Sequence, residues 1–173
     1  KNLLELAHQT SPDLAPLDVN KALEQSIMFL SKQSIFHNIK IIKELEAELP
    51  PILGNISHLN QVFINILVNA AEAMDGSGVI SVQSKFEKKR GLVSLSLTDT
   101  GPGISEEILS RIFDPFFSTK EVGKGTGLGL SISYGIIEAH RGRIYVKSRL
   151  GEGTTFFIEF PLYQNHDQAG LSS

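Results

Sequence analysis

The most constraining stretch of this sequence is a run in which every second residue of positions 123–129 is glycine. Alternating glycines suit neither a helix nor a strand, because each one increases the conformational entropy that is lost on folding. Apolar residues then recur at helical spacing from Leu128 to Ile137. A glycine loop that leads into a helix start presents unpaired N–H groups at the positive end of the helix dipole, which favours an anion. The run therefore predicts a phosphate-binding loop, with a merely mobile loop as the alternative.

The composition excludes several classes of protein. The chain has 173 residues and no cysteine, so a disulfide scaffold, a thiolate zinc site and a cysteine nucleophile are all excluded. The net charge of −3 gives no broad basic field, so we expect no nucleic-acid partner. No apolar run approaches the roughly 18 residues that a membrane-spanning helix needs, so this chain is not expected to span a membrane. The length predicts one domain with one core.

Hydrophobic periodicity predicts a mixed order of helices and strands. Helices are expected at about residues 18–33, 57–74, 105–112 and 128–139. Strands are expected at about residues 39–45, 79–86, 92–98, 143–148 and 154–160. Several of the links are short and hairpin-like. The sequence therefore predicts an α+β fold, a two-layer α/β sandwich in which helices cover one face of a mixed, mostly antiparallel sheet.

The helix expected at residues 57–74 carries a polar stripe on an otherwise apolar surface. Its polar residues Gln61, Asn65, Asn69 and Glu72 follow one another at spacings of four, four and three, which places them on one face. Each unsatisfied polar group in a core costs about 1–3 kcal/mol, so this stripe must face a partner or a wet cavity. A structural hydrogen-bond network is the alternative for the two asparagines.

An acidic residue, Asp99, follows the strand expected at residues 92–98 and precedes Gly101 and Gly103. A carboxylate beside closely approaching backbone is able to accept a hydrogen bond from an exocyclic amino group such as that of adenine. An aspartate that caps a simple turn is the alternative. Lys120 and Lys124 flank the glycine run and are able to neutralise phosphate, although lysines in such loops are often only solvated.

Magnesium prefers oxygen ligands and keeps several waters, so one asparagine carbonyl together with triphosphate oxygens is a reasonable site for this ion. The five histidines show no metal-ligand spacing. We therefore expect magnesium, if present, at the asparagine stripe.

Five motifs occur in a fixed order, and we name them the N box, the G1 box, the F box, the G2 box and the last glycine turn. They are residues 65–69, then Asp99 with Gly101 and Gly103, then residues 113–117, then residues 123–129, then Gly151 with Gly153 and Thr154. This order resembles the catalytic, ATP-binding domain of sensor histidine kinases, whose Bergerat fold is shared with DNA gyrase, the ninety-kilodalton heat-shock chaperones and the MutL repair ATPases. The stretches IFDPFFSTK and GTGLGLSI are most similar to the nitrogen-regulatory type of kinase.

The resemblance implies ATP and Mg²⁺ as cofactors and a role for each matching residue. Asp99 would bind the adenine amino group, with Thr154 helping through water. Asn69 would ligate magnesium, Asn65 would lie beside the phosphates as a catalytic residue, and Lys120 would meet a phosphate. The remaining nucleotide contacts would come from Gly101, Gly103, Gly123, Gly125, Thr126, Gly127, Leu128 and Gly129. Residues 118–127 would form a flexible ATP lid.

Three positions refine this implication. The hydrolytic relatives have a glutamate that activates water at the position of Asn65, and an amide is not a general base, so phosphoryl transfer is favoured over rapid hydrolysis. Many kinases have a lysine where this chain has Glu72, which leaves the contact between residue 72 and ATP open. Phe116 and Phe117 would anchor the near end of the lid.

The resemblance also implies an organisation for the whole protein. Residues 1–15 would be the end of a dimerisation helix and a linker, residues 16–163 the ATP-binding catalytic domain, and residues 164–173 a disordered tail. The γ-phosphoryl group would pass to a histidine on an absent dimerisation domain and then to an aspartate of a response regulator. His8 lacks the context of a phospho-accepting histidine, so this chain is not expected to autophosphorylate alone. We expect a homodimeric full-length protein, cytoplasmic at this domain, with or without a membrane anchor.

Two other functions remain open at this point. A serine kinase of the anti-sigma-factor type has the same fold, but it should lack a dimerisation helix such as the one suggested by apolar residues 3–6. A degenerate domain that binds partners and no nucleotide is the second, although the intact aspartate, asparagines and lid glycines favour nucleotide binding.

Overall fold

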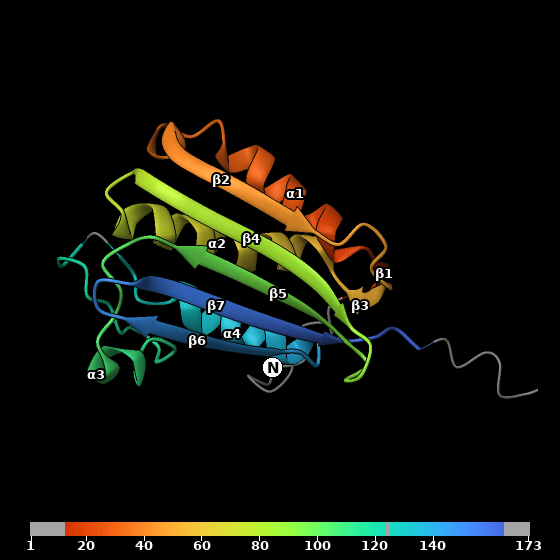
Figure 1. The fold of residues 1–173 in the computed structure, drawn as a ribbon. Helices are drawn as coiled ribbons and strands as arrows, with labels where there is room; N and C mark the ends of the chain where they lie inside the picture. The colour runs from red at the N-terminus through yellow and green to blue at the C-terminus, as the bar shows by residue number, and fades with distance from the viewer. Residues whose placement is uncertain (1–12, 124, 165–173) are drawn as a thin grey trace, which may run out of the picture.

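The computed structural model describes residues 13–123 and 125–164 and has one main sheet, shown in Figure 1. The strands are β1 (Ala15–Leu17), β2 (Asn38–Leu45), β3 (Ile52–Gly54), β4 (Ser77–Glu87), β5 (Leu92–Asp99), β6 (Arg143–Arg149) and β7 (Gly153–Pro161). The helices are α1 (Val19–Leu30), the short 3₁₀ turn η1 (Ser34–Phe36), α2 (Ile56–Ala73), α3 (Glu106–Leu109) and α4 (Gly129–Ala139).

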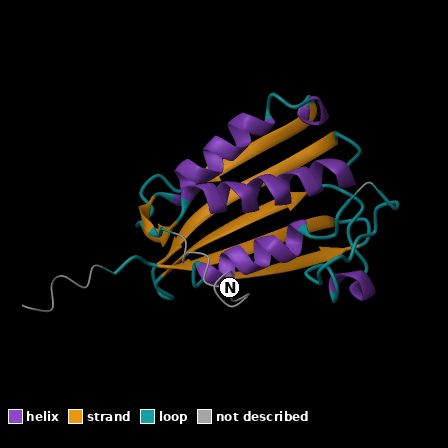
Figure 2. Cartoon of the chain, turned by 180° about the vertical axis from the view of Figure 1, so that it is seen from behind, coloured by secondary structure: helices purple, strands orange, loops and turns teal. Residues whose placement is uncertain are grey.

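The five-stranded sheet has the strand order β2-β4-β5-β7-β6. Strands β2 and β4 are parallel, and the other neighbours are antiparallel. Helices α1, α2 and α4 lie together on one face of the sheet (Figure 2). The predicted α+β, two-layer sandwich with a mixed, mostly antiparallel sheet is therefore confirmed.

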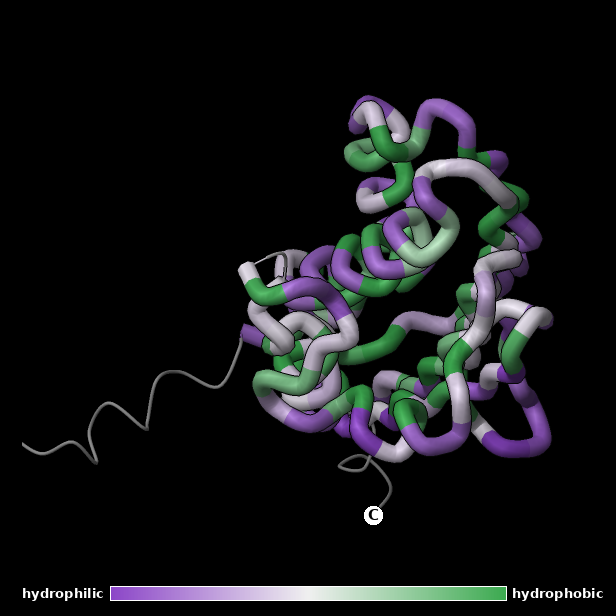
Figure 3. The backbone as a smooth tube through the Cα atoms, turned by 90° about the vertical axis from the view of Figure 1, so that its left-hand side faces the viewer, coloured by the Kyte–Doolittle hydropathy of each residue, from purple (hydrophilic) through white to green (hydrophobic). Residues whose placement is uncertain are grey.

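Strand β5 shows why one face of the sheet is covered and the other is not. Its residues alternate strictly between half-buried and buried, so that Val93, Leu95 and Leu97 point into the core. Hydrophobic and hydrophilic residues also alternate along much of the chain in Figure 3. Because the period of a strand is two, the last inward position of β5 is Asp99. The alternation therefore brings a carboxylate to the helical side of the sheet.

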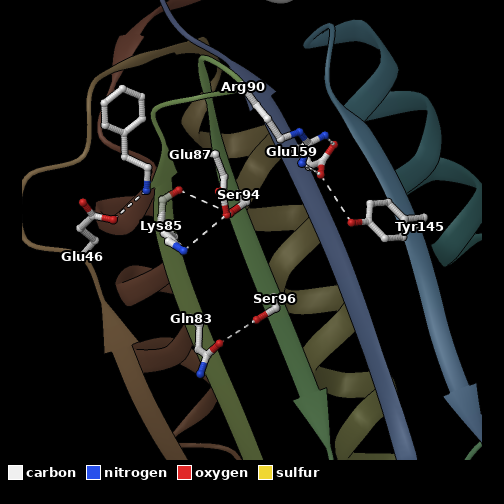
Figure 4. A network of polar contacts seen from close by, with 10 residues as sticks. Glu46, Gln83, Lys85, Glu87, Arg90, Ser94, Ser96, Tyr145 and Glu159 are labelled. Atoms are coloured by element: carbon white, nitrogen blue, oxygen red, sulfur yellow. Dashed lines mark hydrogen bonds and ion pairs between the residues drawn. The ribbon is translucent and has the colours of Figure 1, made fainter.

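The outer face of the sheet is held by polar and aromatic contacts, some of which Figure 4 shows. Arg90 in the β4–β5 hairpin donates two hydrogen bonds, of 2.7 and 3.0 Å, to the carboxylate of Glu159 on β7. The rings of Tyr145 and Phe157 stack with their centroids 4.9 Å apart. Cross-strand salt bridges and ring stacks of this kind stabilise the strand register on the solvent-exposed face of the sheet.

Helix α2 forms the centre of the core. Its buried side chains pack between the sheet and the neighbouring helices α1 and α4, and they are Leu59, Val62, Phe63, Ile66, Leu67, Ala70 and Ala71. The side chain of Asn55 caps the helix by accepting a hydrogen bond from the His58 N–H at 3.1 Å. The helix spans nearly the range predicted from its apolar pattern.

Three expectations about elements need correction. Helix α3 has four residues instead of the eight expected at 105–112, because the Ser110 hydroxyl bonds back to the carbonyl of Glu107 and Pro115 prevents helical geometry further on. Helix α1 ends at Leu30, earlier than expected. The short antiparallel pair β1–β3 was not expected, since three-residue strands carry no periodic signal. The helix end expected at residues 3–6 lies outside the described residues.

The buried histidine His140 joins the end of α4 to the start of α2. Its Nε2 accepts a hydrogen bond from the Asn55 N–H at 3.0 Å, and its Nδ1 lies 2.7 Å from the carbonyl oxygen of Ile136, to which the neutral ring donates. Burial lowers the pKa of His140 below its ordinary value of 6.5. The folded state therefore favours the neutral ring.

This arrangement predicts a pH-dependent stability. The unfolded chain protonates His140 more readily than the folded protein does, so the free energy of unfolding should fall as the pH drops below about 6.5. His140→Gln should lower the free energy of unfolding by about 1–3 kcal/mol near neutral pH, because the Asn55 N–H loses its acceptor, and should flatten the pH dependence. Urea titrations at about pH 7.5 and about pH 5.5 measure both effects. His37→Gln, at an exposed position, is the control, and an equal change in the two variants would contradict the assignment.

Candidate functional site

A cavity of about 860 Å³ lies beyond the end of β5 and beside the last turns of α2. Residues 118–121 and 125–127 of the lid and the first residues of α4 contribute to its wall. Its apolar walls include Ile104, Ile108, Ile112, Leu130, Leu150 and Phe156. Its polar groups include Asn65, Asn69, Glu72, Asp99, Lys120 and Thr154. A mostly apolar cavity with a few convergent polar groups is the common form of a small-molecule site.

Asp99 lies at the floor of this cavity and is 6% exposed. Its Oδ1 accepts a hydrogen bond from the Gly101 N–H at 2.8 Å, and its carboxyl group also interacts with the backbone N–H of Thr154. Burial raises the pKa of Asp99, and these two backbone donors oppose the shift. Two oxygens have more acceptor capacity than two donors use, so the carboxylate is able to accept from a ligand as well.

The floor of the cavity requires glycine at two positions. Gly103 has a φ of +74°, and a Cβ placed there would lie 1.9 Å from the carbonyl oxygen of Arg149. Gly153 has a φ of +86°, and its Cβ would lie 2.1 Å from the carbonyl oxygen of Asp99. The backbone segments of the G1 box and the last glycine turn are therefore in direct contact.

Ser148, which the sequence reading did not single out, ties these two segments together. Its hydroxyl oxygen accepts from the Ile104 N–H at 2.8 Å and lies 2.7 Å from the Gly153 carbonyl, to which it donates. The hydroxyl of Thr154 lies 2.8 Å from the same oxygen. The sequence signal available was a serine three residues before Gly151, and serines of this kind are common at strand ends.

The polar stripe of α2 faces hollows, as predicted. Asn65, Asn69 and Glu72 line the main cavity, and Gln61 lines a smaller groove between α2 and α4 with a volume of about 610 Å³. The structural alternative also holds in part for Asn65, whose amide donates to the hydroxyl of Ser133 at 3.0 Å. This asparagine thus joins α2 to α4 and still reaches the cavity wall.

The lid crosses to α2 through Lys120. The Lys120 ammonium forms an ion pair with the Glu72 carboxylate and lies 3.5 Å from Oδ1 of Asn69. An amide carbonyl and a carboxylate, one helical turn apart, therefore surround one cation. Oxygen donors of these types are the ligands that Mg²⁺ takes, so the residues fit the expected metal, with the ammonium standing in for it.

The near end of the lid corrects one expectation. Phe117 lines the cavity, and the Arg111 guanidinium lies 4.4 Å from its ring centroid. Phe116 has a φ of +64° and is 76% exposed, so its side chain does not anchor the lid. Its backbone does pack closely, because a Cβ on Gly127 would lie 2.5 Å from the carbonyl carbon of Phe116.

The far end of the lid leads into α4, as the glycine run predicted. No side chain caps this helix at Leu128. Gly125, Thr126, Gly127 and Gly129 line the cavity. Uncapped amides at a helix start beside the cavity are suited to an anion.

Some expected site residues stand apart from the cavity. Gly101, Gly123 and Leu128 are not among the residues that line it. Gly101 acts through its N–H on Asp99. Lys124 lies outside the described residues.

Comparison with known proteins places this geometry in a family. The family described as histidine kinase-, DNA gyrase B-, and HSP90-like ATPase matches residues 54–164. Sporulation kinase E of Bacillus subtilis (strain 168) is 42% identical over 150 residues, which cover 87% of this chain and 20% of that protein.

Solved structures agree with the sequence match. Full-length ShkA in complex with AMPPNP has a TM-score of 0.76 and 30% identity, over 89% of this chain and 32% of that one. The catalytic domain of the histidine kinase ThkA, in a nucleotide-free form, has a TM-score of 0.74 and 32% identity, over 86% of this chain and 95% of that one. ThkA has also been solved in complex with the response regulator TrrA. The chain therefore belongs to the family of histidine kinase-, DNA gyrase B- and HSP90-like ATPases, and its relatives include the histidine kinase ThkA.

Proposed function

We propose that this chain is the ATP-binding catalytic domain of a sensor histidine kinase, which transfers the γ-phosphoryl group of ATP to a histidine on a separate dimerisation domain. The observation that carries the proposal is Asp99, a buried carboxylate that lines the same mostly apolar cavity as the two asparagines of α2. The histidine kinase ThkA and the AMPPNP-bound protein ShkA, which share the fold, support it. They also favour this function over the anti-sigma-factor type of kinase and over a domain that binds no nucleotide.

Each residue has a role in this proposal. Asp99 accepts a hydrogen bond from the adenine amino group, and Ser148 fixes Thr154 beside it. Asn69 offers its carbonyl oxygen to Mg²⁺, which when bound would neutralise phosphate charge. Lys120 binds a phosphate. The backbone of the glycine motifs holds the rest of the nucleotide, through the cavity-lining residues Gly103, Gly125, Thr126, Gly127 and Gly129. Gly101 acts through Asp99, and Gly123 and Leu128 would contact the nucleotide only once the lid closes over it.

Asn65 favours transfer over hydrolysis. Its amide is already bound to Ser133 and is not a general base, so no side chain at this position activates water. Bound ATP then stays unhydrolysed until the acceptor histidine of another domain reaches it.

The wider assignments are also proposals. The stretches IFDPFFSTK and GTGLGLSI support the nitrogen-regulatory type of kinase. The complex of ThkA with TrrA supports a response regulator as partner. Residues 16–163 are then the catalytic domain of a homodimeric protein, with this domain in the cytoplasm. The helix end and linker expected at residues 1–15 and the tail expected at residues 164–173 lie mostly outside the described residues. No helix among residues 13–123 and 125–164 is long and apolar enough to cross a membrane.

The first test is nucleotide binding with Asp99→Asn. Mg-AMPPNP at about 100 times its dissociation constant should stabilise the wild-type chain by roughly 2.7 kcal/mol, measured as a thermal shift. Asp99→Asn should lose most of that shift at the same concentration, because the amide nitrogen would face the adenine amino group or the Gly101 N–H. Asp114→Asn, at an exposed aspartate, is the matched control. Equal shifts in the wild type and in Asp99→Asn would contradict the assigned role.

The second test is phosphoryl transfer. The chain incubated alone with ATP labelled on the γ-phosphate should stay unlabelled, because His8 lacks the context of an acceptor. Added dimerisation domain from the same kinase should become labelled. Stoichiometric labelling of His8 in the chain alone would show that the acceptor has been assigned wrongly.

A further inference from the structure

The cavity contains a carboxylate that the proposed chemistry does not use. Glu72 lies on α2, one helical turn after Asn69, and it lines the cavity. Its partner is the ammonium of Lys120, which reaches over from the lid, 48 residues away in sequence. The described part of the chain thus places an acid directly beside the groups that are proposed to hold the phosphates.

The described residues that line the cavity carry more negative than positive charge, which opposes the binding of a nucleotide. Among the described residues that line it, Lys120 is the only cation, and the carboxylates of Glu72 and Asp99 already outnumber it. A triphosphate adds several negative charges. The single positive charge of Lys120 is unable to compensate both the Glu72 carboxylate and a phosphate group. Glu72 would therefore repel a nucleotide that binds without a metal ion.

The ion pair between Lys120 and Glu72 is able to open so that each side chain takes another partner. Both side chains are 37% exposed, so water screens the pair, and its opening does not leave a charge deep in the core. The stem of Lys120 passes close to Gly125, where a Cβ would lie 2.9 Å from the Lys120 Cδ. Near the other end of the lid, the Ser118 hydroxyl accepts a hydrogen bond from the Lys120 N–H at 3.1 Å.

We propose that Glu72 is a specificity residue, which makes the site select the magnesium complex of a nucleotide over the free nucleotide. Lys120 neutralises Glu72 while the site is empty and holds the lid against α2. This inference rests on the proposed nucleotide site. Glu72 and Asn69 both offer oxygen to a cation, and a phosphate chain that arrives without a cation meets a carboxylate there instead.

Glu72→Gln tests the role of the charge at nearly constant shape. The substitution keeps the helix and removes one negative charge, and it frees Lys120 to meet a phosphate. Binding of AMPPNP in EDTA should tighten, so the ratio of dissociation constants, in EDTA over in MgCl₂, should fall about tenfold, the effect of one partly exposed charge near the phosphates. Glu138→Gln, at an exposed position on α4 outside the cavity, should leave the ratio unchanged.

Calorimetric titration with AMPPNP, in MgCl₂ and in EDTA, measures these ratios for the three proteins. If the wild type binds Mg-AMPPNP and Glu72→Gln keeps the wild-type ratio, the specificity role is wrong and the proposed function stands. A lower ratio caused by weaker binding in MgCl₂ would support the same role, through the oxygen that Glu72 offers to the cation. If the wild type binds AMPPNP in neither buffer, the proposed function fails and this inference with it.

Hydrogen exchange of the nucleotide-free protein gives a second reading that needs no ligand. In Glu72→Gln and in Lys120→Met, amides of residues 118–122 should exchange several times faster than in the wild type, because the lid loses its tie to α2. Glu138→Gln should match the wild type. Unchanged exchange in both cavity variants would overturn the proposed tie.

Discussion

The structure depends on the burial of helix α2, whose apolar residues point in nearly every direction. The sheet covers one side of this helix, and α1 and α4 cover others. The one stripe that is polar is left facing hollows, because unpaired amides and a carboxylate would be costly anywhere else. The packing that stabilises the domain thus also sets the position of the site. The other faces of α2 are buried mostly among apolar groups, so Asn65, Asn69 and Glu72 lie on the one face that borders the cavity.

The other half of the site is made by backbone in close contact. Strand β5 ends with Asp99 turned inward, and the turns after β5 and before β7 meet so closely that Gly103 and Gly153 leave no room for a Cβ. Ser148 then binds both turns through its hydroxyl. A carboxylate held by such a rigid frame is pre-organised, which reduces the entropy lost when a ligand is ordered. The lid adds Lys120, whose ammonium pairs with Glu72 on α2.

Much of this was predictable from the sequence, because it follows from short-range periodicity. The spacing of the stripe on residues 57–74 placed three side chains at the cavity, and the alternation of β5 brought Asp99 to the helical side. The glycine run correctly indicated a loop that leads into a helix start. These features each depend on residues a few positions apart.

The features that were missed depend on contacts between distant residues. The ion pair between Glu72 and Lys120 joins residues 48 positions apart, and no local pattern indicates it. The part played by Ser148 follows from the contact of two turns, and the exposure of Phe116 follows from a left-handed backbone that sequence does not reveal. The three-residue strands β1 and β3 are too short to show a period.

The most direct measurement of the central claim is an NMR titration of the chain with Mg-AMPPNP. The account predicts that the backbone amides of Gly101 and Thr154, which interact with Asp99, and the side-chain amide of Asn69 shift together and saturate together. Amides of the outer sheet face, such as Phe157, should stay near their starting positions. Saturable shifts confined to the outer face, or no shifts at millimolar nucleotide, would contradict the claim that this cavity is the nucleotide site.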